Sequence, residues 1–364
     1  MKRKFYFRVL GSLVAFVLWW GVGAAQPSHY SVSLTGGRVI PVNGSRYDGN
    51  SPTLGIDFAV AWQQAGEESW MQFWQAPFMG IRANYAHVYN DIAGDRFELA
   101  GFLEGEVYRR LHWTYSVGLS AYTRPYCLTH DTVNSFISSY LNCLIDLGFL
   151  YDVPLRNGNE LFFATKLVHT SNGYLYKPNH GLNYLQAELG YRFASRPSAG
   201  YFPRSNSLAA RWNATRDTSS LHTRLFFSFA PGAVMSREDP IDEIRYYFAY
   251  TAQVGVIRQV HPCFAFGGNL DLMYNFAHKA YAPADEWPVY PALHVFGDCN
   301  WGPVTLRLGL AHYLAYYPQN WEQYYERVGL YYRFGRDYRQ RLGVAMKVHY
   351  DHIDYIEWTY SFEL

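Results

Sequence analysis

Apolar and polar residues alternate along much of this chain, in segments of about ten residues separated by turn-forming stretches. The pattern is clearest at the end of the sequence, where Ile356, Trp358, Tyr360, Phe362 and Leu364 alternate with Glu, Thr, Ser and Glu. Successive side chains of a strand point to opposite faces, so one face of this segment is apolar and the other polar. This pattern predicts a transmembrane β-barrel with an apolar wall toward lipid and a polar lumen.

Such segments recur through the chain. The predicted strands are 52–61, 77–88, 96–108, 112–122, 139–151, 160–171, 182–193, 221–230, 244–258, 263–274, 290–300, 303–314, 325–334, 341–350 and 353–363, with a further strand at 30–37. Single-chain bacterial barrels usually have an even strand number, so we expect roughly 12 to 16 strands, with about 14 as the central value. We therefore predict an all-β fold in which residues 26–364 form one antiparallel barrel without a second domain. Polar connections at 62–76, 194–220 and 275–289 are expected as its extracellular loops or edge turns, and an exported soluble β-sandwich is the alternative fold.

The first residues have the order of a secretory signal peptide. Residues 1–4 are basic, and an apolar stretch from Val9 to Ala25 ends on small residues. We expect cleavage after Ala25, which assigns 1–25 to the signal peptide; a retained signal anchor is the alternative. The next residue is Gln26 rather than Cys, so lipid attachment is not indicated. The alternating aromatic residues at the C-terminus resemble the signal that the barrel-assembly machinery recognises.

The composition fits a membrane barrel. Aromatic residues make up 19% of the chain, with 33 Tyr, 24 Phe and 11 Trp, as expected when rings gather at both membrane interfaces. After residue 25 no stretch approaches the roughly 20 apolar residues of a membrane-spanning helix. The net charge is +1, so no polybasic surface for nucleic acid is predicted.

The four cysteines are Cys127, Cys143, Cys263 and Cys299. An even number in an oxidising compartment permits two disulfides across hairpins, Cys127 with Cys143 and Cys263 with Cys299. Four free thiols are equally compatible with the sequence. No CxxC pair or nearby His has the spacing of a metal site, so no metal is predicted.

The segment with candidate chemistry runs from Lys166 to Glu188. His169 and Ser171 lie two residues apart on a predicted strand and therefore share a face. Leu167 has the same parity, while Lys166 has the other, so His169 and Ser171 are expected on the lipid-facing wall. Polar groups on such a wall are costly unless they have a function.

A serine becomes a nucleophile when a neighbouring histidine takes its proton, and a third group must orient that histidine. Asn183, on the next predicted strand, has the parity of the same outer wall. Glu188 has the opposite parity and should face the lumen. The predicted catalytic residues are Ser171, His169 and Asn183; Glu188 would replace Asn183 only if a bulge shifted the register.

The connection between these two strands is rich in Gly, Asn and Pro, which favour turns and positive φ. Its amides are candidates for an oxyanion hole that stabilises a tetrahedral intermediate. The predicted contributors are Asn172, Gly173 and Asn179.

The run His169-Thr-Ser171-Asn172, followed by Pro178-Asn179-His-Gly-Leu, resembles the outer-membrane lipid A 3-O-deacylase (PagL) and acyloxyacyl hydrolase family. The resemblance implies a strand-borne His base and Ser nucleophile, with an acid on the next strand and Asn179 near the oxyanion. The sequence departs from the family in having Asn183 at the position of its Glu, and the chain is longer than the small deacylases. His-x-Ser-Asn-Gly with a following Asn is similar to outer-membrane phospholipase A.

The predicted function is therefore an outer-membrane serine esterase that removes ester-linked acyl chains from lipid A in a Gram-negative bacterium. The phospholipase resemblance implies phospholipid as the alternative substrate and admits Ca²⁺ at the oxyanion; otherwise no cofactor is expected. A non-catalytic pore or structural barrel is the alternative of another class. Four polar residues near the C-terminus are expected in a turn and the lumen rather than in a second site: Asp351, His352, Asp354 and Glu357.

Overall fold

The computed structural model describes most of the chain outside its N-terminus. The described residues are 27–40, 51–89, 93–129, 132–156, 158–195, 207–216, 221–235, 240, 245–281, 288–315, 323–349 and 352–364. The predicted signal peptide lies outside these residues and remains a prediction.

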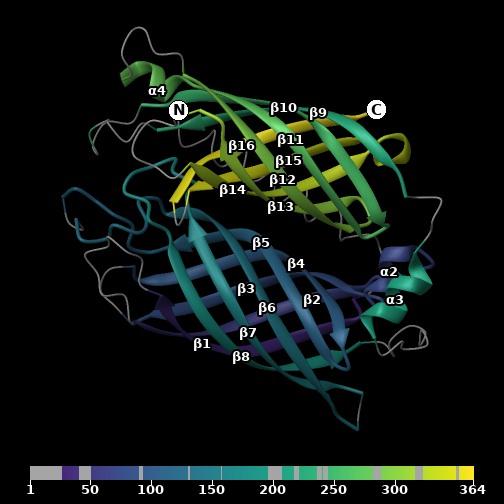
Figure 1. Ribbon diagram of the computed structural model, residues 1–364. Coiled ribbons are helices and arrows are strands. Elements are labelled where there is room, and N and C mark those ends of the chain that lie inside the picture. The colour runs from purple at the N-terminus through teal and green to yellow at the C-terminus, as the bar shows by residue number, and fades with distance from the viewer. Residues whose placement is uncertain are drawn as a thin grey trace. The chain divides into compact units, whose positions relative to one another are not determined.

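The N-terminal half forms a closed antiparallel barrel of eight strands (Figure 1). Its strands are β1 (His29–Ile40), β2 (Pro52–Gln63), β3 (Phe78–Val88), β4 (Asp95–Tyr108), β5 (Leu111–Tyr122), β6 (Leu141–Pro154), β7 (Glu160–Ser171) and β8 (Leu182–Ala194). Each strand pairs with the next in sequence, and β8 returns to β1 with Glu188 opposite Thr35. This last pairing closes the sheet and leaves no free edge.

The C-terminal half forms a second closed barrel, also of eight strands. Its strands are β9 (Thr223–Val234), β10 (Tyr247–His261), β11 (Phe264–Asn275), β12 (Val289–Trp301), β13 (Val304–Tyr313), β14 (Tyr324–Phe334), β15 (Gln340–His349) and β16 (His352–Glu363). Here β16 pairs with β9, with Phe362 opposite Phe227.

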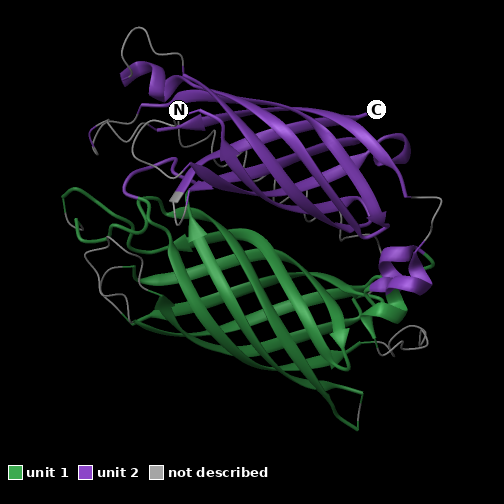
Figure 2. Cartoon of the chain, viewed as in Figure 1, with its two compact units in different colours: residues 1–67, 74–172, 179–211 green, residues 68–73, 173–178, 212–364 purple. Residues whose placement is uncertain are grey.

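The expectation of one barrel without a second domain is wrong. The total of 16 strands lies within the predicted range, but the strands close into two barrels of eight. Figure 2 shows the two compact units: one holds β1–β8, and the other holds β9–β16 with residues 68–73 and 173–178. The physical reason is the β1–β8 pairing, which satisfies the backbone groups of both edge strands before β9 begins.

The described residues include three short helices between strands, α2 (Ser69–Phe73), α3 (Leu208–Thr215) and α4 (Phe276–Tyr281), with a 3-10 turn at Arg336–Tyr338. The connection predicted at 194–220 follows β8, whose last residue is Ala194, and leads to β9 of the second barrel; it includes α3. Among the described residues, no helix has the length and apolar character needed to cross a membrane.

The predicted alternation is confirmed along the strands. In β7, Phe163 and Leu167 are each 53% exposed, while Lys166 between them is buried. In β16, Trp358, Tyr360 and Phe362 are exposed on the outside, and Glu357, Thr359, Ser361 and Glu363 are buried inside. Asp354 is also buried, as expected for a group in the lumen. Both barrels thus have the apolar outer wall and polar interior of transmembrane barrels.

The lumen of the first barrel is filled with paired charges. Arg82 lies 3.0 Å from Asp57 and also contacts Asp146, and Lys166 lies 2.9 Å from Glu188. Eight strands give an interior just wide enough for side chains to fill. This packing counts against the pore alternative for the first barrel.

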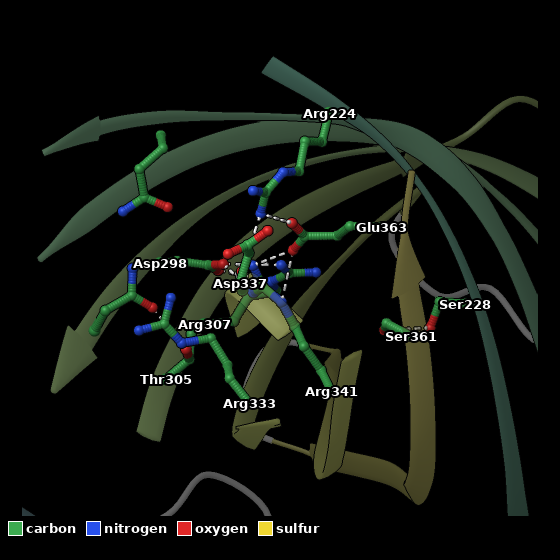
Figure 3. A network of polar contacts seen from close by, with 12 residues as sticks. Arg224, Ser228, Asp298, Thr305, Arg307, Arg333, Asp337, Arg341, Ser361 and Glu363 are labelled. Carbon is green, nitrogen blue, oxygen red and sulfur yellow. Dashed lines mark hydrogen bonds and ion pairs between the residues drawn. The ribbon is translucent and has the colours of Figure 1, made fainter. Parts of the chain in front are cut away.

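The second barrel has a comparable network at one end of its lumen (Figure 3). Arg307 donates two hydrogen bonds to Asp298, at 2.7 and 2.9 Å, and Arg341 bridges Asp298 and Glu363. Arg224 reaches the other oxygen of Glu363 at 3.2 Å. Each carboxylate is therefore matched by guanidinium groups, as burial of charge requires.

Candidate active site

His169 and Ser171 lie at the end of β7, and Asn183 lies at the start of β8. The two strands pair without interruption from Glu160 opposite Arg192 to Thr170 opposite Leu182, and His169 is directly opposite Asn183. No bulge shifts the register in this region, so the three side chains share the outer-wall parity that the sequence predicts.

The three side chains form a linear hydrogen-bonded series. The Nδ1 of His169 lies 2.8 Å from Oδ1 of Asn183, and Nε2 of His169 lies 3.1 Å from Oγ of Ser171. An amide oxygen only accepts, so this contact places the imidazole proton on Nδ1. Nε2 is then left with a lone pair facing the serine hydroxyl, which is the tautomer that a general base requires.

The hydroxyl of Ser171 is more enclosed than an outer-wall position suggests. Ser171 is 2% exposed, so it is shielded from bulk solvent although its parity is that of the outer wall. Cys143 on β6 is directly opposite Ser171 and points to the same side. None of the four cysteines is in a disulfide in the structure, so of the two alternatives left open by the sequence it has the one without disulfides.

Glu188 lies on the other side of the wall. Its carboxylate is 2.9 Å from Nζ of Lys166 and accepts a hydrogen bond from Gln186 at 2.9 Å. It is buried in the lumen. The prediction that Glu188 faces away from His169 is confirmed.

The connection after β7 contains the three residues predicted for an oxyanion hole. The backbone N–H of Asn172 donates to Oδ1 of Asn179 at 3.2 Å, and its side-chain amide donates to Oγ of Ser138 at 3.1 Å. Gly173 has a φ of 65°, which glycine adopts without strain. In this structure the Asn172 N–H is thus engaged by Asn179 and would have to exchange that acceptor for an oxyanion.

Gly181 brings the backbone close to the histidine. Its φ is 71°, and a Cβ at this position would lie 2.8 Å from Cε1 of His169 and 3.3 Å from Cβ of Ser171. Real Cβ atoms do not approach so closely, so only glycine fits here. The backbone at Gly181 therefore limits the space in which the imidazole can turn.

The segment 134–137, between β5 and β6, holds this backbone in place. Backbone carbonyls of Ser135 and Phe136 accept hydrogen bonds from the N–H groups of His180 and Gly181, at 3.3 and 3.0 Å. Asn134 organises the segment, because its Oδ1 accepts from the N–H groups of Phe136 and Ile137 at 3.2 and 3.1 Å.

Apolar burial anchors the same segment. Phe136 and Ile137 are buried in a cluster that includes Val168 of β7 and Leu182 of β8. On the lumen side of β7, the hydroxyl of Tyr122 contacts Thr170 at 2.7 Å and Tyr184 at 2.9 Å. The strand ends that carry His169, Ser171 and Asn183 are therefore fixed by packing from within the barrel.

Sequence reasoning missed Asn134 and Ser138. Asn followed by Ser-Phe-Ile is a plausible local turn signal, but nothing in the sequence places it beside a segment more than 40 residues later. Only the folded barrel brings these loops to one end.

One cluster in the first barrel has the spacing of metal ligands. Ligand atoms of Glu104, His112 and Asp152 lie within 4.8 Å of one another. Arg192 lies 3.0 Å from Glu104 and 3.2 Å from Asp152, so its guanidinium already balances both carboxylates. The arrangement is explained by this ion-pair network.

The second barrel does not repeat the site on its penultimate strand. After Gln340 at the start of β15, its outward positions are Leu342, Val344, Met346 and Val348, all apolar, in the part of the strand that the structure describes. The candidate chemistry thus belongs to the first barrel.

Comparison with known protein families supports this division. Residues 56–192 match the family described as lipid A 3-O-deacylase (PagL), and residues 220–364 match the acyloxyacyl hydrolase C-terminal domain. The resemblance indicated by the segment around His169 and Ser171 is confirmed. The first match lies within β2–β8 of the first barrel, and the second spans β9–β16 of the second barrel. A search of curated proteins finds no match.

Several solved barrels are similar in part. A crystal structure of the outer membrane enzyme PagL is 17% identical, covering 45% of this chain and 99% of that one, with a TM-score of 0.33. A mutant porin of Rh. blastica is 12% identical over 92% of this chain and 99% of its own, with a TM-score of 0.18. The siderophore receptor PirA from Acinetobacter baumannii is 8% identical over 89% and 68%, with a TM-score of 0.26. These scores are low, so the fold assignment rests on the strand pairing described above.

Proposed function

We propose that this chain is a serine esterase of the Gram-negative outer membrane that removes ester-linked acyl chains from lipid A. The observation that carries the proposal is the series from Asn183 Oδ1 through His169 to Ser171 Oγ, with contacts of 2.8 and 3.1 Å. The family match over the first barrel supports the substrate class. The outer leaflet then supplies the substrate, and the barrel-assembly machinery inserts the protein.

The reaction follows from the geometry. Ser171 Oγ attacks the ester carbonyl carbon while His169 Nε2 takes the hydroxyl proton, and the carbonyl oxygen becomes an oxyanion. Backbone amides of the 172–181 connection, with Asn172, Gly173 and Asn179 as candidates, stabilise that charge. His169 returns the proton to the sugar oxygen as the carbon–oxygen bond breaks, which releases the alcohol and leaves an acyl-enzyme.

Water completes the cycle. His169 deprotonates a water molecule that attacks the acyl-enzyme, and the fatty acid leaves as Ser171 regains its proton. Asn183 keeps the imidazole in the productive tautomer throughout. Because Ser171 is 2% exposed, the covering atoms must shift before a substrate ester reaches Oγ.

The experiment compares the lipid A acyl composition of outer membranes, by mass spectrometry, with and without the protein. We expect one ester-linked acyl chain to be lost with the wild type, and activity to fall by about three orders of magnitude or more in Ser171→Ala and His169→Ala. Thr165→Ala is the matched control, because Thr165 is an exposed outer-wall hydroxyl on the same strand. Near wild-type turnover by purified Ser171→Ala would refute the assignment.

A second substrate class is supported by the third residue of the series. The neutral Asn183 resembles the phospholipase A pattern rather than the deacylase pattern with its Glu, so phospholipids belong in the same assay, with and without Ca²⁺. Release of fatty acid from phospholipid but not from lipid A would assign the same three residues to a phospholipase.

A further inference from the structure

The outer wall beside the proposed site carries one arginine. Across the sheet, His169 on β7 is opposite Asn183 on β8, and Asn183 is opposite Ile40 on β1. Arg38 lies two residues before Ile40, opposite Leu185, and therefore has the same outward parity as His169 and Asn183. Its side chain is exposed on that wall.

Outward apolar side chains flank Arg38 on the wall. Leu34 is 62% exposed on the same strand, Leu185 is 56% exposed on one neighbouring strand, and Leu54 is 55% exposed on the other. At the outward strand positions described for β1–β8, Arg38 is the single Arg or Lys. Arg38 is therefore the one guanidinium that these positions of the outer wall offer to an anionic group of a lipid.

The spacing between Arg38 and Ser171 suits a headgroup. Arg38 on β1 is opposite Leu185 on β8, and Leu185 is opposite Leu167 on β7. Arg38 is therefore two strands away from Ser171 and level with the residue four positions before it. With about 4.8 Å between strands and about 3.3 Å per residue, the two Cα atoms are roughly 16 Å apart along the wall. The extended side chain of Arg38 covers part of this distance. The remaining distance fits a phosphorylated sugar and is too long for a single ester group.

We propose that Arg38 binds a phosphate group of the lipid substrate and so directs the ester of the same molecule toward Ser171. This inference rests on the proposed function, in which the substrate is lipid A, a phosphorylated and acylated disaccharide. Guanidinium groups form paired, charge-assisted hydrogen bonds to phosphate. With the phosphate at β1, the sugar lies across β8 and its ester reaches the end of β7.

The test measures kcat/KM of the purified full chain in neutral-lipid nanodiscs, with phosphorylated lipid A and with the same lipid A after phosphatase treatment. For the wild type we expect a preference of about tenfold for the phosphorylated form, the size of one charge-assisted contact. In Arg38→Gln the preference should fall to about twofold or less through a higher KM, and Arg38→Lys should keep part of it. The control is Arg258→Gln, since Arg258 is an exposed outward residue of β10 in the second barrel.

Two further arms identify the source of any effect. In the first arm, anionic phospholipid is added to the nanodisc. If it changes the difference in kcat/KM between the wild type and Arg38→Gln while dephosphorylation of the substrate does not, Arg38 binds neighbouring lipids and the proposal is wrong. An unchanged preference in Arg38→Gln would also overturn it. Binding of lipid A to Ser171→Ala protein, with and without Arg38→Gln, is measured in parallel. If the wild type hydrolyses no lipid A, the proposed function fails, and this binding comparison still decides whether Arg38 recognises phosphate.

Discussion

The Oδ1 of Asn183 lies 2.8 Å from Nδ1 of His169, and this contact fixes which imidazole nitrogen faces Ser171. An amide can set the tautomer as a carboxylate does, but it stabilises the imidazolium formed during attack less strongly. The contact therefore predicts that the activity left after substitution of Asn183 depends on which residue replaces it.

Asn183→Ala should lower kcat by roughly tenfold to a hundredfold, because the His169 N–H loses its acceptor while nucleophile and base remain. Asn183→Asp should stay active, since it keeps an oxygen opposite Nδ1. Single-turnover acyl release from lipid A measures both. A loss in Asn183→Ala as large as that in Ser171→Ala would mean that Asn183 does more than orient the imidazole.

Glu188→Gln should leave turnover of the folded protein almost unchanged, because Glu188 pairs with Lys166 inside the lumen. Its expected effect is on stability, since removing one partner leaves a buried cation less well balanced. Urea unfolding of the refolded barrel measures the stability, and the esterase assay measures turnover. An inactive but stably folded Glu188→Gln protein would contradict the side-chain placement.

Gly181→Ala should lower kcat, because a Cβ would lie 2.8 Å from Cε1 of His169 and force the imidazole or the loop to move. Gly158→Ala is the matched control: its φ of 82° is similarly positive, but a Cβ there meets nothing within 4 Å. Both variants carry the same kind of backbone strain, and only Gly181→Ala should lose activity. Equal losses would indicate strain rather than crowding of the site.

Asn134→Ala should reduce kcat more than it raises KM, because it releases the turn whose carbonyls hold His180 and Gly181. Asn134→Asp keeps the oxygen that accepts from Phe136 and Ile137 and should restore much of the loss. Steady-state kinetics on lipid A separates the two parameters. Failure of Asn134→Asp to recover activity beyond Asn134→Ala would show that this turn does not position the site.

The protein should form no channel in planar bilayers, because Arg82 and its carboxylate partners fill the lumen of the first barrel, and Arg307 and Arg341 with theirs occupy the second. Single-channel recording checks this directly. Stable conductance steps from purified protein would favour the pore alternative.

The faces of the site residues were readable from the sequence because they depend only on near neighbours. Alternation along a strand assigns His169, Ser171 and Asn183 to the outer wall and Glu188 to the lumen, provided that no bulge intervenes. The register from Glu160 to Thr170 is uninterrupted, so this local rule sufficed. The family resemblance was also readable from the sequence, because it depends on a short run of residues around His169.

The division into two barrels was decided only by the tertiary structure. The strand pattern predicts that β8 pairs with a strand on each of its two edges, but it does not predict whether the strand next to the second edge is β9 or β1. In the structure this strand is β1, and Glu188 lies opposite Thr35, about 150 residues earlier in the chain. The support of the site is equally non-local. Asn134 reaches His180 and Gly181 only after closure has brought the β5–β6 and β7–β8 connections together at one end of the barrel. Backbone hydrogen bonds between strands can form in many registers and orders, and the one adopted is selected by the packing of the whole lumen, which no single segment encodes.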